Sequence, residues 1–228
     1  MKKLFSALSI LVTLMIPFLL MMGAIRILLN PFYLDYEYNL SNFPADPFGF
    51  TTADRLHWGK ISLDYLTNDQ GIEFLGDLKF ADGTSFYNER ELSHMHDVKD
   101  LIQTTLKIWY ACLAAFLLLL IWSYVQKWSE VFWRGVARGG LLTVAIIILV
   151  LLGTVINFDT LFRDFHAIFF TGDTWLFYVN DSLIRLFPEK LWSDAFTFMG
   201  IFTLTGAIIL GFGGLRGAHN LIFEHRKK

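Results

Sequence analysis

The stretch GGLLTVAIIILVLLGTVINF, residues 139–158, carries no charged side chain and is almost entirely apolar. Its length is close to the about 20 residues that an α-helix needs to cross the hydrocarbon core of a bilayer. Three further charge-free runs of similar length lie at residues 4–25, 108–126 and 195–215. The four runs predict an α-helical integral membrane protein with four transmembrane helices.

The composition supports a membrane protein and argues against other classes. Charged residues make up 18% of the chain, whereas soluble domains carry about 25%. The first apolar run is longer than the roughly 7–15 residues of a signal-peptide core and no small-x-small cleavage site follows it, so we expect an uncleaved helix. The net charge of −2 and the lack of a basic stripe argue against a nucleic-acid partner.

The distribution of Lys and Arg predicts the orientation of the spans. The two ends of the chain and the loop after the second run together hold nine basic and two acidic residues. Residues 31–104 hold thirteen acidic and five basic residues, and residues 159–194 hold six and three. By the positive-inside rule, both termini are predicted to be cytoplasmic and the two acidic segments extracytoplasmic.

These patterns assign every part of the chain to the membrane or to one side of it. The predicted transmembrane helices cover residues 1–29, 106–126, 139–157 and 194–215. The other predicted segments are an extracytoplasmic cap at 30–105, a cytoplasmic loop at 127–138, an extracytoplasmic interfacial segment at 158–193 and a cytoplasmic tail at 216–228.

The cap is predicted to be small and mixed α/β, with helices and a β-hairpin. The sequence from Thr52 to Leu66 is typical of a helix, with Thr52 as the N-cap. Apolar residues flank Asp82-Gly83, a dipeptide that favours a type I′ hairpin turn. From Ser93 onward we expect a helix that continues without a break into the second span.

An ionisable cluster, ELSHMHDVKDL, occupies residues 91–101 just before the second span. Helical spacing places His94 and Asp97 on one face and His96 on another. A neutral imidazole that is oriented by a carboxylate can act as a general base near pH 7. His94 is therefore a candidate catalytic residue, and the alternative is a hydrogen-bonded histidine at the membrane interface.

A second histidine, His166, has the same features. If Phe158–Phe169 is helical, Asp159 lies seven residues away on nearly the same face. Both histidines lie close to predicted span boundaries on the extracytoplasmic side. Two such residues at the same depth favour a shared site over two unrelated interface residues.

The sequence also contains residues that could bind a metal or form a thioester. His94, His96, Asp97 and His166 could supply zinc ligands, but neighbours two apart on a helix diverge by about 200° and no H-E-x-x-H element occurs, so we expect no metal. The single cysteine, Cys112, lies in the second span and is expected to pack as a small apolar residue. It remains a reserve candidate for a thioester-forming nucleophile.

Two blocks of sequence, ERELSHMHDVKDL (residues 89–101) and FDTLFRDFHAIFFTGDTWLFYVNDSLIRLFPEKLW (residues 158–192), together resemble the bacterial lipoprotein intramolecular transacylase family. The four-span layout with a large first outer loop extends the resemblance along the chain. The family pattern E-L-x-H-M-x-D-V falls on His94 and leaves His96 at a variable position. The pattern F-D-x-L-F-x-x-F-H falls on His166.

The resemblance implies an acyltransferase of the bacterial plasma membrane with its active site on the extracytoplasmic face. Its substrates would be lipoproteins with a diacylglyceryl group on the N-terminal cysteine. The sn-2 acyl chain would move to the α-amino group of that cysteine and leave a lyso-form lipoprotein. Neither a soluble cofactor nor an energy source is implied, and the other expected partner is membrane phospholipid.

The resemblance also gives expected roles to particular residues. His94 and His166 would act as general acid and base, in an order that the sequence does not assign. Asp97 and Asp159 would orient the two rings.

Donors for the developing oxyanion could come from three residues of the second block: Arg163, Arg185 and Trp175. The arginines could instead bind lipid phosphates. A covalent acyl-histidine route is an alternative mechanism. Alternative functions are a non-catalytic membrane receptor or assembly subunit, and a metal-dependent membrane hydrolase.

Overall fold

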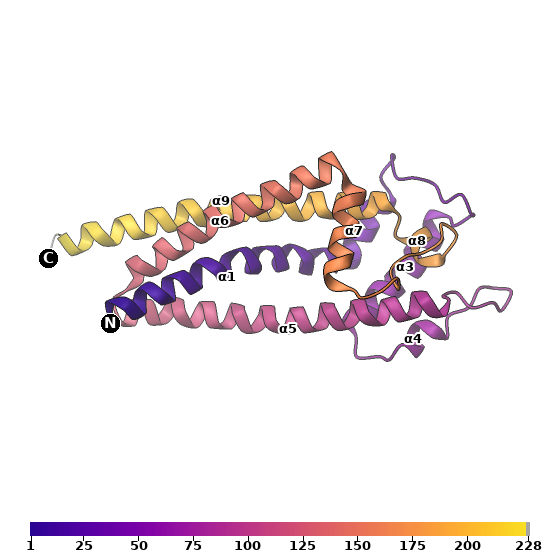
Figure 1. Cartoon of the computed structure of the whole chain (residues 1–228), viewed down its shortest axis with the longest axis horizontal. Helices are drawn as coiled ribbons and strands as arrows, with labels where there is room; N and C mark the ends of the chain where they lie inside the picture. The colour runs from indigo at the N-terminus through magenta and orange to yellow at the C-terminus, as the bar shows by residue number, and fades with distance from the viewer. Residues whose placement is uncertain (227–228) are drawn as a thin grey trace. The chain divides into compact units, whose positions relative to one another are not determined.

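The computed structural model describes residues 1–226, with side chains described through Leu221. The helices of this part are α1 (Lys2–Leu28), α2 (Pro31–Tyr38), α3 (Thr52–Thr67), α4 (Glu73–Gly76), α5 (Glu89–Val125), α6 (Ser129–Ile156), α7 (Phe158–Phe169), α8 (Ser182–Leu186) and α9 (Glu189–Arg226) (Figure 1). Of the predicted cytoplasmic tail, Lys227 and Lys228 lie outside the described residues.

The chain divides into two compact units. The first consists of Met1–Ile25, Lys107–Val155 and the described part of Phe196–Lys228, and the second of Arg26–Leu106 and Ile156–Ala195. Helices α1, α5 and α9 each contribute residues to both units.

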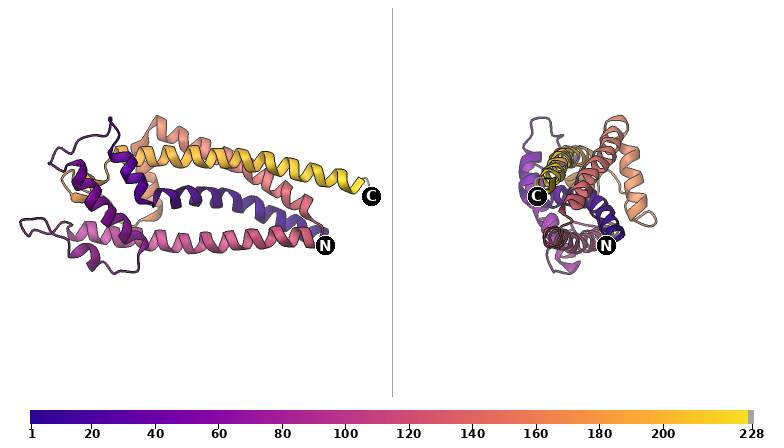
Figure 2. Two further views of the ribbon diagram at one scale, coloured as in Figure 1. Left: turned by 180° about the vertical axis from the view of Figure 1, so that it is seen from behind. Right: turned by 90° about the vertical axis from the view of Figure 1, so that its left-hand side faces the viewer.

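Four helices confirm the predicted number of spans. Helices α1, α5 and α6, and the part of α9 up to Leu221, are long and apolar enough to cross a membrane. Within the first unit their segments lie side by side in both views of Figure 2. The prediction that one helix runs unbroken from Ser93 into the second span is also confirmed, because α5 begins at Glu89.

Glycines on α6 allow close approach of the helices in the first unit. A Cβ atom added at Gly140 would lie 2.6 Å from the carbonyl oxygen of Ala207 on α9, and one at Gly139 would lie 2.7 Å from Ile16 on α1. Small residues at helix crossings are typical of packing in membranes, where van der Waals contact replaces the hydrophobic effect. Helix α6 therefore contacts both α1 and α9 closely.

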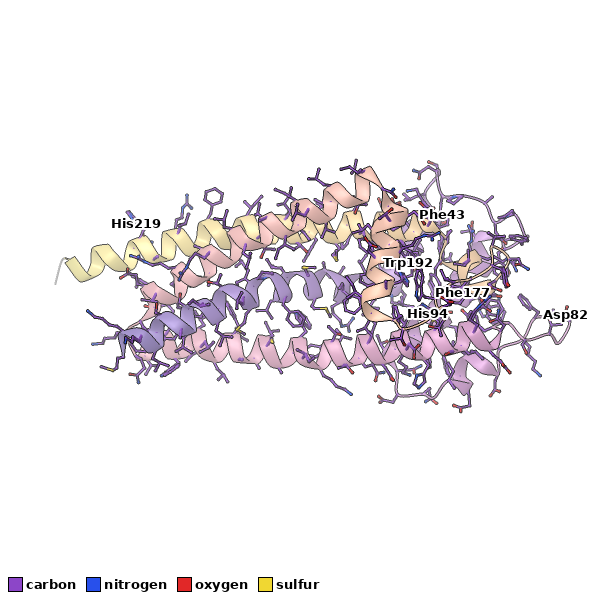
Figure 3. The ribbon with its side chains drawn as sticks, viewed as in Figure 1. Phe43, Asp82, His94, Phe177, Trp192 and His219 are labelled. Atoms are coloured by element: carbon purple, nitrogen blue, oxygen red, sulfur yellow. The ribbon has the colours of Figure 1, made fainter. Side chains whose placement is uncertain are left out.

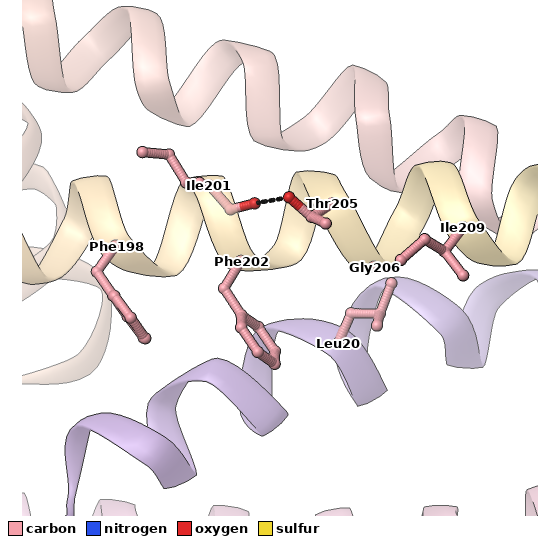
Figure 4. A pocket seen from close by; sticks show the side chains of 7 residues that line it. All are labelled: Leu20, Phe198, Ile201, Phe202, Thr205, Gly206 and Ile209. Carbon is pink, nitrogen blue, oxygen red and sulfur yellow. Dashed lines mark hydrogen bonds between the residues drawn. The ribbon is translucent and has the colours of Figure 1, made fainter.

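An open apolar pocket of ≈ 440 Å³ lies in the first unit, on α9 beside Leu20 of α1 (Figure 4). Its lining consists of Leu20, Phe198, Ile201, Phe202, Thr205, Gly206 and Ile209. The Thr205 hydroxyl donates to the Ile201 carbonyl at 2.8 Å. The lining therefore suits a lipid acyl chain and not a polar ligand.

The second unit contains α2, α3, α4, α7 and α8, with one end each of α1, α5 and α9. Its main core consists of Tyr65, Leu75, Phe86, Tyr87, Met95, Leu183 and Leu186. The N-cap of α3 is Thr51 and not the predicted Thr52. Thr51 and Asp54 form a reciprocal capping box, which fixes the cap because each side chain satisfies the other residue's backbone N–H.

The predicted β-hairpin is not confirmed, since the described residues contain no strand. One antiparallel bridge, Lys79 to Ser85, flanks the turn. The Gly83 N–H donates to the Phe80 carbonyl at 2.9 Å, and Gly83 has φ +85°. A type I′ turn would also need a positive φ at Asp82, which is not observed. The segment is a tight turn, and Phe86, three residues after Gly83, belongs to the core of the second unit.

Candidate active site

His94 lies in the first turns of α5. Residues 89–100 include six charged side chains, so the apolar spanning part of the helix begins after them. The buried stripe of these turns contains Glu91, His94 and Met95. Only 6% of His94 is exposed, whereas the side chain of His96 is 56% exposed. The prediction that the two histidines are not equivalent is confirmed.

His166 lies near the C-terminal end of α7, whose bounds match the prediction. Asn157 caps the helix by accepting from the Thr160 N–H at 3.0 Å. Of the twelve residues of α7 only Phe158 and His166 are buried, and 9% of His166 is exposed. The exposed remainder of the helix includes Ile168 and Phe169.

A hydrogen bond fixes the tautomer of neutral His166. Its Nδ1 atom lies 2.8 Å from the Phe162 carbonyl oxygen, one turn earlier in α7. A carbonyl can only accept, so Nδ1 carries the proton and donates. The Nε2 atom of His166 therefore keeps its lone pair and can accept a proton from a substrate.

The two histidines, seventy-two positions apart in the sequence, meet in the second unit. Their ring centroids are 6.0 Å apart with an interplanar angle of 25°. Aromatic rings enclose the pair. Phe170 lies 4.9 Å from His94 and 5.5 Å from His166, and Phe177 lies 5.3 Å from His94 (Figure 3). Phe162 and Trp175 lie 4.1 Å and 5.1 Å from His166.

This apolar enclosure keeps both rings neutral. Burial, with a smaller contribution from the neighbouring His166, lowers the pKa of His94 from 6.5 to about 4. Burial also lowers the pKa of His166, although its hydrogen bond to the Phe162 carbonyl opposes the shift. Because each charge disfavours the other, the pair accepts one proton more readily than two.

One atom of the site has unused hydrogen-bonding capacity. The Nδ1 atom of His94 is buried and has no hydrogen-bond partner among the described residues. Most buried polar atoms in proteins are paired, and a catalytic role is one explanation for an unpaired one. His94 is thus available to a group that is absent from the free protein.

Neither predicted carboxylate orients a histidine. Asp97 is exposed and lies 3.9 Å from His96, because His94 is at the edge of the buried stripe and Asp97 falls outside it. Asp159 lies 3.1 Å from Arg163. Seven residues return a helix to nearly the same face, but they also advance it by about 10 Å. The Phe162 carbonyl orients His166 instead.

The three predicted oxyanion donors have different surroundings. Arg163 is exposed and pairs with Asp159. Arg185 donates to the Asp46 carboxylate at 2.9 Å and 3.1 Å and lies 3.5 Å above the Phe50 ring. Of the three residues, only Trp175 contacts a histidine of the site.

The residues considered as zinc ligands do not converge. His96 and Asp97 are exposed, away from the buried pair of His94 and His166. No group of three or more His, Cys, Asp or Glu side chains in the described part of the chain is placed to hold a metal.

Sequence reasoning missed the aromatic enclosure and two polar residues beside it. No role in the site was predicted for Phe162, Phe170 or Phe177. Arg90 and Asp181 were also missed, although Arg90 precedes His94 by one helical turn. A Phe-rich block around a histidine was the available signal, but spacing within one segment does not show which rings reach a second segment.

Comparison with models of known protein families identifies one family. The family model for the lipoprotein intramolecular transacylase Lit matches residues 10–192. A protein of Aquifex aeolicus (strain VF5), described as uncharacterized, is 26% identical over 223 residues, which cover 95% of this chain and 96% of that protein.

Solved structures share the fold. The in meso structure of the membrane integral lipoprotein intramolecular transacylase Lit from Bacillus cereus matches with a TM-score of 0.80 at 20% identity and covers 100% of both chains. A variant of that protein with one histidine replaced by alanine matches with a TM-score of 0.72 at 21% identity, covering 100% of this chain and 98% of that one. The family match spans most of the sequence, and together with the four apolar helices it shows that this chain is a multi-pass membrane protein of the lipoprotein intramolecular transacylase family.

Proposed function

We propose that this protein transfers the sn-2 acyl chain of a diacylglyceryl-modified lipoprotein to the α-amino group of the same N-terminal cysteine. The observation that carries the proposal is the buried pair of neutral histidines, His94 and His166, with ring centroids 6.0 Å apart in an aromatic enclosure. The reaction needs no cofactor, because ester and amine belong to one molecule. Bringing them together can contribute several kcal/mol by proximity, within the roughly 7–11 kcal/mol available to well-oriented intramolecular reactions.

The amine attacks in its neutral form, after its ammonium form has released one proton to water, and the attacking nitrogen must then lose a second proton as the amide forms. An α-amino group has a pKa of about 8 in water, and an apolar enclosure disfavours its charged form further. His166 is the better base in this geometry, because its Nδ1 proton is held by the Phe162 carbonyl and its Nε2 lone pair is free. We therefore assign proton abstraction to His166.

In the transfer step, the amine nitrogen attacks the ester carbonyl carbon and the C–N bond forms. The C–O bond to glycerol then breaks, and the glycerol oxygen leaves as an alcohol. The amine proton passes to His166 Nε2, and the glycerol oxygen receives a proton through His94. Passage of a proton from His166 to His94 restores both neutral rings, so that atoms and charges balance.

The tetrahedral intermediate needs a donor for its oxyanion. Trp175 is the best placed of the predicted donors, since its ring lies 5.1 Å from His166. Arg185 contributes instead to the fold through Asp46. The concentration of Lys and Arg at the two ends of the chain and in the loop after the second apolar run supports cytoplasmic termini, and hence an active site on the extracytoplasmic face.

Mass spectrometry of lipoprotein N-terminal peptides tests this function. The protein is expressed in a bacterial host that lacks its own N-acylating enzymes. We expect lyso-form peptides with one acyl chain on nitrogen and one on glycerol. Substitution of His94→Ala or His166→Ala should lower the rate by on the order of 10²–10⁴-fold, the usual contribution of a general acid or base.

His96→Ala is the matched control, because His96 is exposed and lies 3.7 Å from Asp100, away from the pair. Lipoproteins that keep both chains on glycerol in the presence of the wild-type protein would refute the proposal and favour the non-catalytic receptor. A substrate with a blocked amine tests the covalent alternative, since a lipid adduct on either histidine would replace direct transfer by an acyl-histidine route.

A further inference from the structure

The two histidines are closed off in this structure. His94 is 6% exposed and His166 9% exposed, so little of either ring is open to a glyceryl ester or an amine. Much of the cover comes from one connecting segment, residues 170–181, between α7 and α8. Its aromatic residues lie against the pair: Phe170 touches both rings, Trp175 touches His166 and Phe177 touches His94.

The segment is fastened at its two ends. At the start, the Phe170 N–H donates to the His166 carbonyl at 2.8 Å. At the far end, the Asp181 carboxylate accepts from the Asn88 amide at 3.0 Å and from the Arg90 guanidinium at 2.8 Å. Gly172, between the two ends, has φ +70°, a conformation that favours glycine.

Arg90 connects the C-terminal end of residues 170–181 to α5, the helix that carries His94. It lies one turn before His94 on α5, and its guanidinium lies 4.7 Å from the ring centroid of Tyr178 and 5.6 Å from that of Phe177. Phe177 is therefore held between Arg90 and His94. The Tyr178 N–H also donates to Asp181 at 2.8 Å, so the ion pair orders the part of the segment that covers His94.

We propose that residues 170–181 form a lid over the histidine pair and that the Arg90–Asp181 ion pair is its latch. The inference rests on the proposed function. The lid opens to admit the lipidated N-terminus and closes over it, so that the amine and not water attacks the ester. Arg90 and Asp181 are positioning residues, since they act through Phe177 and Tyr178.

The lid decides between two reactions of the same ester. When the amine attacks, the acyl chain ends on nitrogen and the glycerol hydroxyl is released within the same molecule. When water attacks, a free fatty acid leaves and the lipoprotein retains one acyl chain with a free amine. A loosened lid admits water, so it should raise the share of fatty acid among the products.

The test uses the full-length protein in detergent with a synthetic diacylglyceryl lipopeptide, and mass spectrometry measures N-acyl peptide and free fatty acid. For Arg90→Met we expect the ratio of fatty acid to N-acyl peptide to rise roughly fivefold. A larger change is not expected, because a partly exposed ion pair contributes little to the stability of the closed lid. Asp181→Asn should produce the same change, and the double variant should add little to either. Arg90→Lys should restore part of the wild-type ratio, because it keeps the charge without the guanidinium fork.

Amide hydrogen exchange gives a second readout that does not depend on activity. Peptides from residues 170–181 should exchange faster in Arg90→Met than in the wild type, while peptides from α6 remain unchanged. Lys60→Met is the control, because it removes an exposed ion pair to Asp35 in the same unit and should alter neither measurement.

The lid proposal would be overturned if neither Arg90→Met nor Asp181→Asn changed the product ratio or the amide exchange of residues 170–181. If the wild-type protein forms neither product, the proposed function fails, and the exchange measurement still decides whether Arg90 and Asp181 hold the segment.

Discussion

Two pairs of ionisable side chains in the second unit are buried to a similar degree but differ in their hydrogen bonding. Asp46 accepts from the Phe50 N–H at 2.7 Å and twice from Arg185, and Arg185 also donates to the Phe48 carbonyl at 3.2 Å. The pair of His94 and His166 contains one hydrogen bond to the backbone and one buried nitrogen without a partner among the described residues.

The difference separates structural charges from reactive ones. A buried charge is tolerated when a counter-charge and hydrogen bonds stabilise it, and it then links distant segments. Asp46 and Arg185 are 139 positions apart. A neutral imidazole in an apolar enclosure links distant segments only weakly, but it retains a lone pair that can accept a proton from a substrate. A counter-charge with several hydrogen bonds, and not burial, distinguishes the two roles: Asp46 Oδ2 accepts three hydrogen bonds, although Asp46 Oδ1 has no partner among the described residues.

The largest expected effect is on stability, from Arg185→Met. Loss of the guanidinium leaves the Asp46 carboxylate, whose side chain is 1% exposed, without its counter-charge. Breaking a buried pair in this way should reduce the free energy of unfolding by about 3–5 kcal/mol. Thermal unfolding in detergent measures the change, with Lys60→Met as the exposed-pair control, and a loss below about 1 kcal/mol would show that the pair is not structural.

The next effect is a dependence of stability on pH that comes from the histidines. His94 has a pKa of about 4 when folded and 6.5 as its ordinary value, so its contribution is complete above pH 6.5 and is lost as the pH falls toward 4. The full loss is on the order of 3 kcal/mol. Burial raises the pKa of Asp46, but hydrogen bonds from Arg185 and the Phe50 N–H outweigh burial and hold that pKa below 3.8. Asp46 therefore changes the stability only at lower pH.

Glu37 works in the opposite sense over part of this range. Burial and the neighbouring Asp194 raise the pKa of Glu37 to about 8, so its contribution is lost as the pH rises. The useful quantity is therefore the stability of the wild type minus that of His94→Phe, measured from pH 7 to pH 4. A difference that does not change over this window would refute a buried neutral His94.

The smallest effect, at pH 7, has the opposite sign to that of Arg185→Met. His94→Phe replaces a ring that has an unpaired buried nitrogen by an apolar ring of similar shape. Removing such an unsatisfied group should stabilise the protein by roughly 1 kcal/mol, while acyl transfer falls to background. Destabilisation by more than about 1 kcal/mol would instead give His94 a structural role like that of Arg185.

The sequence by itself determined the parts of this protein that depend on local pattern. Charge-free runs near 20 residues long predicted four spans, because the bilayer thickness sets that length. Helical period separated His94 from His96, and the helix considered at Phe158–Phe169 has the same bounds as α7. The same reasoning failed for Asp97 and Asp159, since angular position around one helix ignores its rise and the edge of its buried face.

Only the tertiary structure decided what surrounds the histidines. The rings that enclose them come from α7 and from residues 170–181, and the Arg90–Asp181 contact joins positions 91 apart. Contacts of this kind depend on how separate segments pack, which no spacing within one segment specifies. The hydrogen bond that fixes the His166 tautomer is local, but the aromatic enclosure that keeps both rings neutral exists only once the second unit has folded.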